Sequence, residues 1–154
     1  MKKIKRKYIV IVIILIALFG VVFTKALTRQ VDVAYCESNN ILIHPPLTFT
    51  SDYILRFHEG IGSMNMHGIA DVSGKKYIIS RVIHFTYVRN GHTYFLTNTN
   101  THSLDKEEVH ASGIDNHFLG FFKAKGRKLV LTLEFDKNKK PMFFINGSLG
   151  FYCN

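Results

Sequence analysis

The sequence predicts a mainly β fold (α+β) that follows a single N-terminal transmembrane helix. Three observations support this: a basic tip and an unbroken apolar run open the chain, short apolar or alternating segments fill most of the remainder, and Gly-, Asn- and Asp-containing turns separate those segments. We expect an antiparallel β-meander, arranged as a partly open barrel or a sandwich, with one short helix. At 154 residues the chain has room for one small domain beside the anchor.

The N-terminal helix is predicted from residues 9–23, which carry no polar side chain and follow the basic segment MKKIKRK. With the bracketing Tyr8 and Thr24 such a helix has about 17 residues and spans about 25 Å, slightly less than the roughly 30 Å hydrocarbon core, and flanking lysines reach the interface. The positive charges ahead of the run hold the N-terminus in the cytoplasm. We therefore expect a cytoplasmic tip (1–7), a transmembrane anchor (8–25) and an exported domain (26–154). A cleaved signal peptide, the alternative, exports the same residues.

The net charge of +9 belongs mostly to the N-terminus, because residues 1–25 hold six basic and no acidic side chains and the remainder carries only +3. This distribution argues against direct nucleic-acid binding by the folded domain. A tip of seven residues cannot fold or catalyse. Any effect inside the cell therefore requires another membrane-spanning chain.

Two cysteines, Cys36 and Cys153, lie near opposite ends of the exported part. An even count in an exported domain favours a disulfide, and two cysteines allow one intramolecular pairing. The bond would close a loop of over 100 residues, for which the chain-entropy relation gives roughly 4–5 kcal/mol. Free buried thiols or an intermolecular bridge remain alternatives. The absence of a CxxC pair argues against a redox enzyme.

Eight strands are expected along the exported part, with turn residues between them. Their ranges are Val31–Cys36, Phe49–His58, Ser63–Val72, Lys76–Arg89, Thr93–Asn98, Lys128–Phe135, Met142–Ile145 and Leu149–Cys153. Asn146-Gly147 is the strongest hairpin signal, because a type I′ turn needs positive φ at both positions. The short helix is expected over Ser103–His110, with a Ser N-cap, and a further short turn over His117–Phe122.

The strand over residues 76–89 is unusual because both of its faces are largely apolar. Such a strand is buried on both sides, lines a ligand cavity or docks on a partner. The content of 13 Phe and 7 Tyr favours a cavity or an interface, since a small domain has limited core, and a well-filled sandwich is the alternative. The candidate partner or ligand face consists of Tyr77, Ile79, Ile83, Phe85 and Tyr87.

Signals for catalysis are thin, because the sequence has no GxSxG, HExxH, P-loop or GxGxxG motif. Gly60 and Gly62 fit turn chemistry. Glu107 and His110 could share a helix face and hold a metal weakly, but a solvated face is the simpler interpretation. We therefore expect no enzyme, no cofactor and no metal.

Eight histidines all lie in the exported part, and no pair has the spacing typical of a metal site. Histidine is the side chain that changes charge between about pH 5 and 8. Full protonation would move the exported part from about +3 toward +11, which would alter contacts with a partner or another copy. The candidate pH-sensing residues are His58, His67 and His84.

A basic tip, one anchor, an early Cys, an RFxxGxG segment, a long aromatic strand and a terminal Cys follow one another in this chain. The residues that mark this order are Arg56, Phe57, Gly60, Gly62, Gly68, Arg81, Phe85, Tyr87, Asp105 and Cys153. In this order the sequence resembles the FidL-like group of small enterobacterial inner-membrane proteins, and more loosely PsaF/MyfF and ToxS.

The resemblance implies a periplasmic sensor or co-regulator subunit, held in the bacterial inner membrane by a single pass. Such proteins bind and stabilise a membrane-anchored winged-helix transcription activator of the ToxR type as a heterodimer, respond to acidity or bile-like lipids, and control fimbrial or virulence genes. VtrC-type relatives form a barrel-like unit completed by a segment of the activator, so we expect pairing by β-augmentation. A standalone periplasmic module for apolar ligands (lipid or bile) is the alternative, and an envelope hydrolase is a third.

Overall fold

The computed structural model describes residues 33–104 and 114–154 of the chain. The chain divides into two compact units, residues 1–32 and 33–154, and the second is described here by itself. The predicted cytoplasmic tip, the predicted anchor and residues 105–110 of the predicted short helix lie outside the described residues. Among residues 33–104 and 114–154, no helix is long and apolar enough to cross a membrane.

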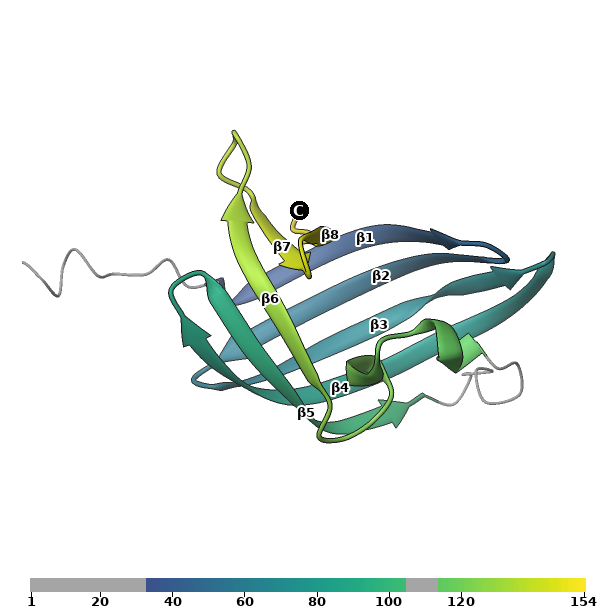
Figure 1. Ribbon diagram of the computed structural model, residues 1–154, viewed down its shortest axis with the longest axis horizontal. Helices are drawn as coiled ribbons and strands as arrows, with labels where there is room; N and C mark the ends of the chain where they lie inside the picture. The colour runs from purple at the N-terminus through teal and green to yellow at the C-terminus, as the bar shows by residue number, and fades with distance from the viewer. Residues whose placement is uncertain (1–32, 105–113) are drawn as a thin grey trace, which may run out of the picture. The chain divides into compact units, whose positions relative to one another are not determined.

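Within the described residues, eight antiparallel strands form one sheet in which each strand pairs with the next along the chain (Figure 1). They are β1 (Tyr35–His44), β2 (Leu47–His58), β3 (Ile61–Val72), β4 (Lys75–Asn90), β5 (Thr93–Ser103), β6 (Lys128–Phe135), β7 (Pro141–Ile145) and β8 (Ser148–Tyr152). The sheet curls until its last strand returns beside its first, which makes a nearly closed barrel. The predicted antiparallel meander is therefore confirmed, and its form is the partly open barrel rather than the sandwich.

Tight turns determine where several strands end. Asn146 and Gly147 both have positive φ, 50° and 81°, as the predicted type I′ turn between β7 and β8 requires. The turn between β2 and β3 has the same pattern at Glu59 and Gly60, with φ of 46° and 85°. These turns match the right-handed twist of the strands they join, so the curling of the sheet begins at its hairpins.

The core fills the inside of the barrel with side chains from every strand. In β2 burial alternates strictly from Leu47 to His58, as expected for a strand with one face inside and one in solvent. Phe57 lies at the centre of an aromatic cluster, with ring centroids 5.2–5.7 Å from those of Phe85, Tyr87, Tyr94 and Phe143. The many aromatic residues of this small domain are therefore largely used to fill the barrel.

Two short 3₁₀ helices, η2 (Ile114–His117) and η3 (Gly120–Phe122), pack against the core between β5 and β6. They lie where the sequence predicted a short turn over 117–122. The buried guanidinium of Arg81 on β4 holds this segment, because it donates to the carbonyl of Phe122 at 3.0 Å and pairs with Asp115 at 3.2 Å. Asn98 on β5 donates to the carbonyl of Phe121 at 2.6 Å. The segment is thereby fastened to two strands of the barrel wall.

Candidate functional site: the seam between the first and last strands

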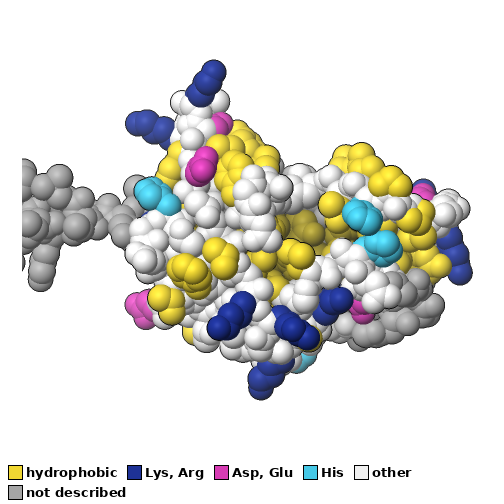
Figure 2. All heavy atoms as spheres, in the orientation of Figure 1, with side chains coloured by type: hydrophobic (Ala, Val, Ile, Leu, Met, Phe, Trp, Pro, Cys, Tyr) yellow, Lys and Arg dark blue, Asp and Glu magenta, His cyan; other side chains and the backbone are white. Residues whose placement is uncertain are grey.

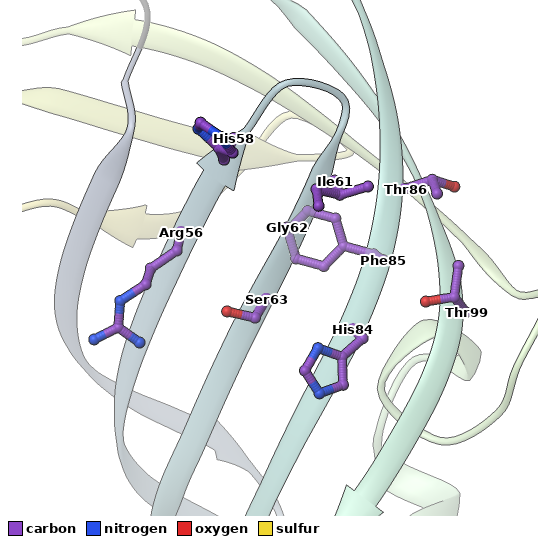
Figure 3. A pocket seen from close by; sticks show the side chains of 9 residues that line it. All are labelled: Arg56, His58, Ile61, Gly62, Ser63, His84, Phe85, Thr86 and Thr99. Carbon is purple, nitrogen blue, oxygen red and sulfur yellow. The ribbon is translucent and has the colours of Figure 1, made fainter.

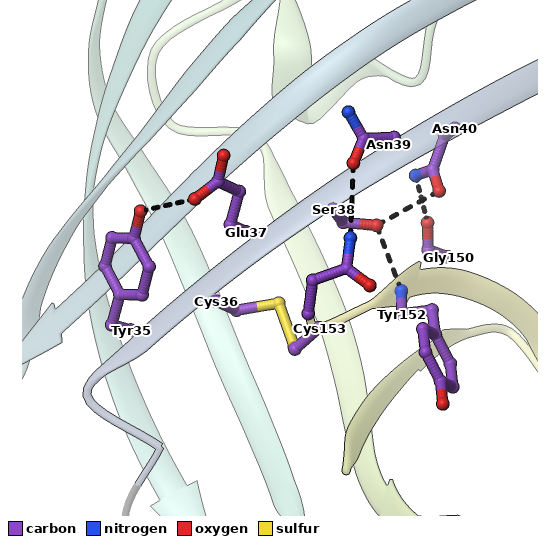
Figure 4. The surroundings of a disulfide bond; sticks show 10 residues. Tyr35, Cys36, Glu37, Ser38, Asn39, Asn40, Gly150, Tyr152 and Cys153 are labelled. Atoms are coloured by element: carbon purple, nitrogen blue, oxygen red, sulfur yellow. Dashed lines mark hydrogen bonds between the residues drawn. A yellow bond between two sulfur atoms is a disulfide. The ribbon is translucent and has the colours of Figure 1, made fainter.

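A disulfide joins the two edge strands of the barrel at one end of their seam. Cys36 and Cys153 are bonded, with 4.9 Å between their Cα atoms and 117 positions between them in sequence (Figure 4). Both residues are buried in the core. The predicted intramolecular disulfide is confirmed, and in the fold it fastens β1 to the residue after β8.

Hydrogen bonds that involve side chains continue the seam beyond the disulfide (Figure 4). The buried Ser38 hydroxyl accepts the N–H of Tyr152 at 3.0 Å and donates to the Asn40 Oδ1 at 3.1 Å. The Asn40 amide in turn donates to the carbonyl of Gly150 at 2.6 Å. Side chains thus take the place of a regular ladder, since the described sheet has no β1–β8 strand pairing.

Beyond Asn40 the two edge strands no longer cover one another. Leu42 lies on the face of β1 that carries Cys36 and Ser38 inside the barrel, yet 45 % of its surface is exposed. Leu149 on β8 lines the cavity behind this gap and is 54 % exposed, and it stands opposite Phe144 on the outer face because the β7–β8 register shifts at Gly150. A core-facing leucine that contacts solvent, with an exposed leucine across the gap, shows that the wall is open here. We call residues 36–40 with 150–154 the disulfide half of the seam, and residues 41–44 with 148–149 the open half.

A cavity of about 500 Å³ lies behind the open half of the seam. Figure 2 shows the molecule hollowed on this face, with hydrophobic side chains in the hollow and histidines beside it. Its lining comes from β1, β2, β7, β8 and the η2–η3 segment: Asn40, Ile41, Leu42, His44, Ser51, Tyr53, His117, Phe118, Leu119, Phe122, Ile145, Ser148, Leu149, Gly150 and Phe151. Burial raises the pKa of Tyr53, which keeps its hydroxyl neutral. The cavity therefore suits an apolar group with a few polar contacts.

The open half of the seam also exposes a backbone edge. The carbonyl of Glu37 accepts from Asn154 across the seam, and residues at even spacing along a strand turn their backbone groups to the same side. Ile41 and Ile43 therefore direct N–H and C=O groups into the gap, where no strand of the described chain pairs with them. Their side chains, on the outer face, are 67 % and 70 % exposed. This short edge is apolar on both faces.

The predicted partner or ligand face on β4 points into the barrel. Ile79, Ile83 and Phe85 are fully buried, and Tyr77 and Tyr87 are half-buried and pack against the core. In this structure these side chains are core, and none of them lines the cavity behind the seam. The apolar seam surface comes from β1 and β8 instead.

The candidate pH-sensing histidines lie on the outer face of the sheet. The His58 Nε2 is 3.9 Å from the Glu59 carboxylate, and the His67 Nδ1 is 3.2 Å from the Ser80 hydroxyl. His84 and His58 line a shallow outer groove of about 560 Å³ with Arg56 and Ser63 (Figure 3). The histidines beside the cavity are others, His44 and His117, with ring centroids 5.5 Å apart. Because His44 and His117 are 73 positions apart in the sequence, no local motif could have indicated that they lie together.

Gly62 and Gly68, two of the residues on which the resemblance to the FidL-like group rests, have packing roles in this structure. A Cβ on Gly62 would collide with the ring of Phe85, so this position needs Gly for close packing between β3 and β4. A Cβ on Gly68 would collide with the carbonyl of Thr50 on β2. Both glycines thus serve the curvature and filling of the barrel rather than a ligand.

No family model matches this chain, and no curated protein or solved structure matches it.

Proposed function

We propose that this chain is a periplasmic co-regulator subunit that binds and stabilises a membrane-anchored, ToxR-like winged-helix activator. The observation that supports this best is the open half of the seam, where a free strand edge, two apolar strand faces and a cavity meet. Anchored in the inner membrane by residues 8–25, the subunit would respond to acidity or to a bile-like lipid and control fimbrial or virulence genes.

Strand addition is the mode of binding that fits this edge. An extended segment of the activator would pair with the backbone groups of Ile41 and Ile43, which point into the gap. Alternate side chains of that segment would enter the cavity beside Leu42 and Leu149. An uncovered apolar edge is an aggregation hazard, so burial by a partner removes a liability as well as providing affinity.

The disulfide limits the length of β1 with which a partner strand can pair. Because Cys36 and Cys153 hold the other half of the seam together, a guest strand can occupy only the segment beyond Asn40. Binding then needs no opening of the core. The activator segment would become protected from proteolysis by completing a wall that is already folded.

The test is co-expression of the full chain with a membrane-anchored, ToxR-like winged-helix activator. We expect the two to co-purify, and the activator's periplasmic domain to resist proteolysis only in the complex. Ile43→Lys should weaken binding at least tenfold, because it places a charge at the docking edge. Val88→Lys is the matched control, since Val88 on β4 is also 70 % exposed on the outer face. Failure to co-purify, or equal effects of both variants, would reject the proposal.

A standalone module for apolar ligands is the second candidate, and the cavity of about 500 Å³ favours it. A fluorescent apolar probe should bind the full chain in either case. If a strand of the activator binds at the seam, addition of the activator's periplasmic domain displaces the probe. In that case Leu149→Lys weakens the binding of the probe and the binding of the activator. If the chain acts alone, Leu149→Lys abolishes probe binding and the activator has no effect.

A further inference from the structure

Two histidines on the outer face of the barrel lie against one another, away from the seam. His84 on β4 and His102 on β5 have ring centroids 5.8 Å apart in an edge-to-face arrangement. Both are exposed, while their neighbours Ile83 and Phe85 are buried, so the imidazoles point to solvent. They are diagonal neighbours, because His84 is opposite Asn100 and His102 is opposite Val82.

An irregularity in the strand pairing brings these two side chains together. The register between β4 and β5 shifts between His84 and Phe85, and Thr99 is left without a cross-strand partner there. A β-bulge of this kind bends the strand, increases its local twist and redirects side chains. Figure 3 shows His84 and Thr99 on the two neighbouring strands at this point. Pairing of β6 with β5 ends at Thr97, and backbone hydrogen bonds to Gly126 and Arg127 extend it to Asn98, just before the bulge.

A third polar group belongs to the same cluster. The Asn100 carboxamide nitrogen is 2.8 Å from the Nε2 of His102, and Asn100 is the register partner of His84. The cluster therefore combines two imidazoles with one carboxamide that contacts the His102 ring, all on paired strands. Imidazole donors suit Zn²⁺, Cu²⁺ and Ni²⁺, whereas Mg²⁺ and Ca²⁺ prefer sites made of oxygen.

The spacing of the rings also fits a shared metal ion. Metal–nitrogen bonds of about 2.0–2.1 Å place the centroids of two imidazoles on one ion roughly 5–6 Å apart. The observed 5.8 Å therefore requires only small rotations of the side chains. Within the described residues, no cluster of three or more His, Cys, Asp or Glu side chains could hold a metal, so water would complete the coordination.

We propose that His84 and His102, with Asn100 as the partner that orients the His102 ring, form an exposed binding site for a divalent transition-metal ion. The metal would link β4 and β5 across the bulge. The other histidine pair, His44 with His117, is the less suitable one, because it joins a strand end to a 3₁₀ helix beside an apolar cavity. That pair therefore serves as an internal control.

The test is titration of the full chain, in detergent micelles, with Zn²⁺ and separately with Mg²⁺, by calorimetry and by NMR of the imidazole resonances. We expect one Zn²⁺ per chain with micromolar affinity, no response to Mg²⁺, and changes in the His84 and His102 resonances. His84→Gln and His102→Gln should each lower affinity at least about 100-fold. Asn100→Ala should lower it about 10- to 100-fold, since outer partners of metal ligands have effects of that size.

Matched controls are His44→Gln, for the second pair, and His67→Gln, for an exposed histidine on the same face of the sheet. Both should bind Zn²⁺ as the unchanged chain does. Circular dichroism of each variant confirms that it is folded. The proposal is overturned if Zn²⁺ does not bind, if neither His84→Gln nor His102→Gln weakens binding, or if His44→Gln weakens it as much. It stands apart from the proposed function, because activator binding does not enter the readout.

Discussion

The two halves of the β1–β8 seam differ in how the first and last strands of the barrel meet. In the disulfide half, a covalent bond and the side chains of Ser38 and Asn40 replace a strand ladder, and both cysteines and Ser38 are buried. In the open half, the same two strands separate and expose Leu42 and Leu149. One fastened half is therefore enough to hold the two edge strands together in this fold. The other half leaves a strand edge and the cavity behind it uncovered.

The largest effect should follow from removing the disulfide. Replacing both cysteines, Cys36→Ser with Cys153→Ser, should lower the free energy of unfolding by about 4–5 kcal/mol, because the unfolded chain loses a cross-link across 117 positions. Urea unfolding followed by circular dichroism measures this. The unchanged protein treated with reductant should unfold at the same urea concentration. A loss below about 1 kcal/mol would mean that the side-chain hydrogen bonds alone hold the seam.

A smaller effect should distinguish two inward-facing leucines. Leu55 on β2 is fully buried opposite Cys36, whereas Leu42 on β1 lies in the open half. Leu55→Ala should cost about 2–5 kcal/mol through lost burial and a cavity, and Leu42→Ala less than about 1 kcal/mol. Urea midpoints of the two variants measure the difference. Equal losses would show that the open half is closed in solution.

A pH-dependent effect is expected at the β6–β7 turn. The Asp136 carboxylate accepts the Tyr152 hydroxyl at 2.6 Å and the N–H groups of Lys140 and Asn138, and these bonds lower its pKa. A lowered folded-state pKa stabilises the fold above the unfolded-state value near 3.8 and loses that contribution as pH falls through the folded-state value.

Asp136→Asn should therefore destabilise the protein by an amount that is constant well above the unfolded-state pKa near 3.8 and that shrinks as pH falls below that value. Urea midpoints at pH 7, 5 and 3 provide the measurement. Glu134→Gln, an exposed carboxylate on β6, is the control for a lost negative charge. If the Asp136→Asn difference persists undiminished in acid, the ionised hydrogen bonds are not its source.

Replacing the histidines on the outer face should have the smallest effect on the stability of the fold. It should nevertheless change any response of the protein to acidity. Replacing His58, His67 and His84 together by Gln should reduce the difference in activator binding between pH 5 and pH 7, because the added charge of this face is removed while His44 and His117 beside the cavity remain. The triple variant should keep its urea midpoint, since all three side chains are exposed. His92→Gln, an exposed histidine of the β4–β5 turn, is the control. A triple variant whose response to pH is undiminished would exclude these residues as sensors.

Much of the strand pattern could be predicted from local sequence. The range of β6 was predicted to the residue, and those of β2, β3, β4, β7 and β8 within two, because alternating apolar residues and turn glycines are local signals. The 4.9 Å Cα separation within the disulfide is also consistent with the reasoning from cysteine count.

The errors concern polar strand segments. The first strand was expected over Val31–Cys36, but β1 runs from Tyr35 to His44 through Glu-Ser-Asn-Asn, and β5 extends past Asn98 through a run of Thr and Asn. Such residues are typical of turns. They form strands here because β1 pairs along its length with β2, and β5 with β4. In β1, the side chains of Ser38 and Asn40 also make hydrogen bonds to β8 across the seam.

Sequence alone determined the order and type of most strands, because these depend on local patterning, and it favoured a bond between Cys36 and Cys153, because two cysteines allow one intramolecular pairing. Only the tertiary structure decided that the sheet curls far enough to bring β1 back to β8, that half of this seam stays open, and that His84 meets His102. These features depend on the twist summed over eight strands and on one bulge between β4 and β5. Neither can be recognised from the residue type at any one position of the sequence.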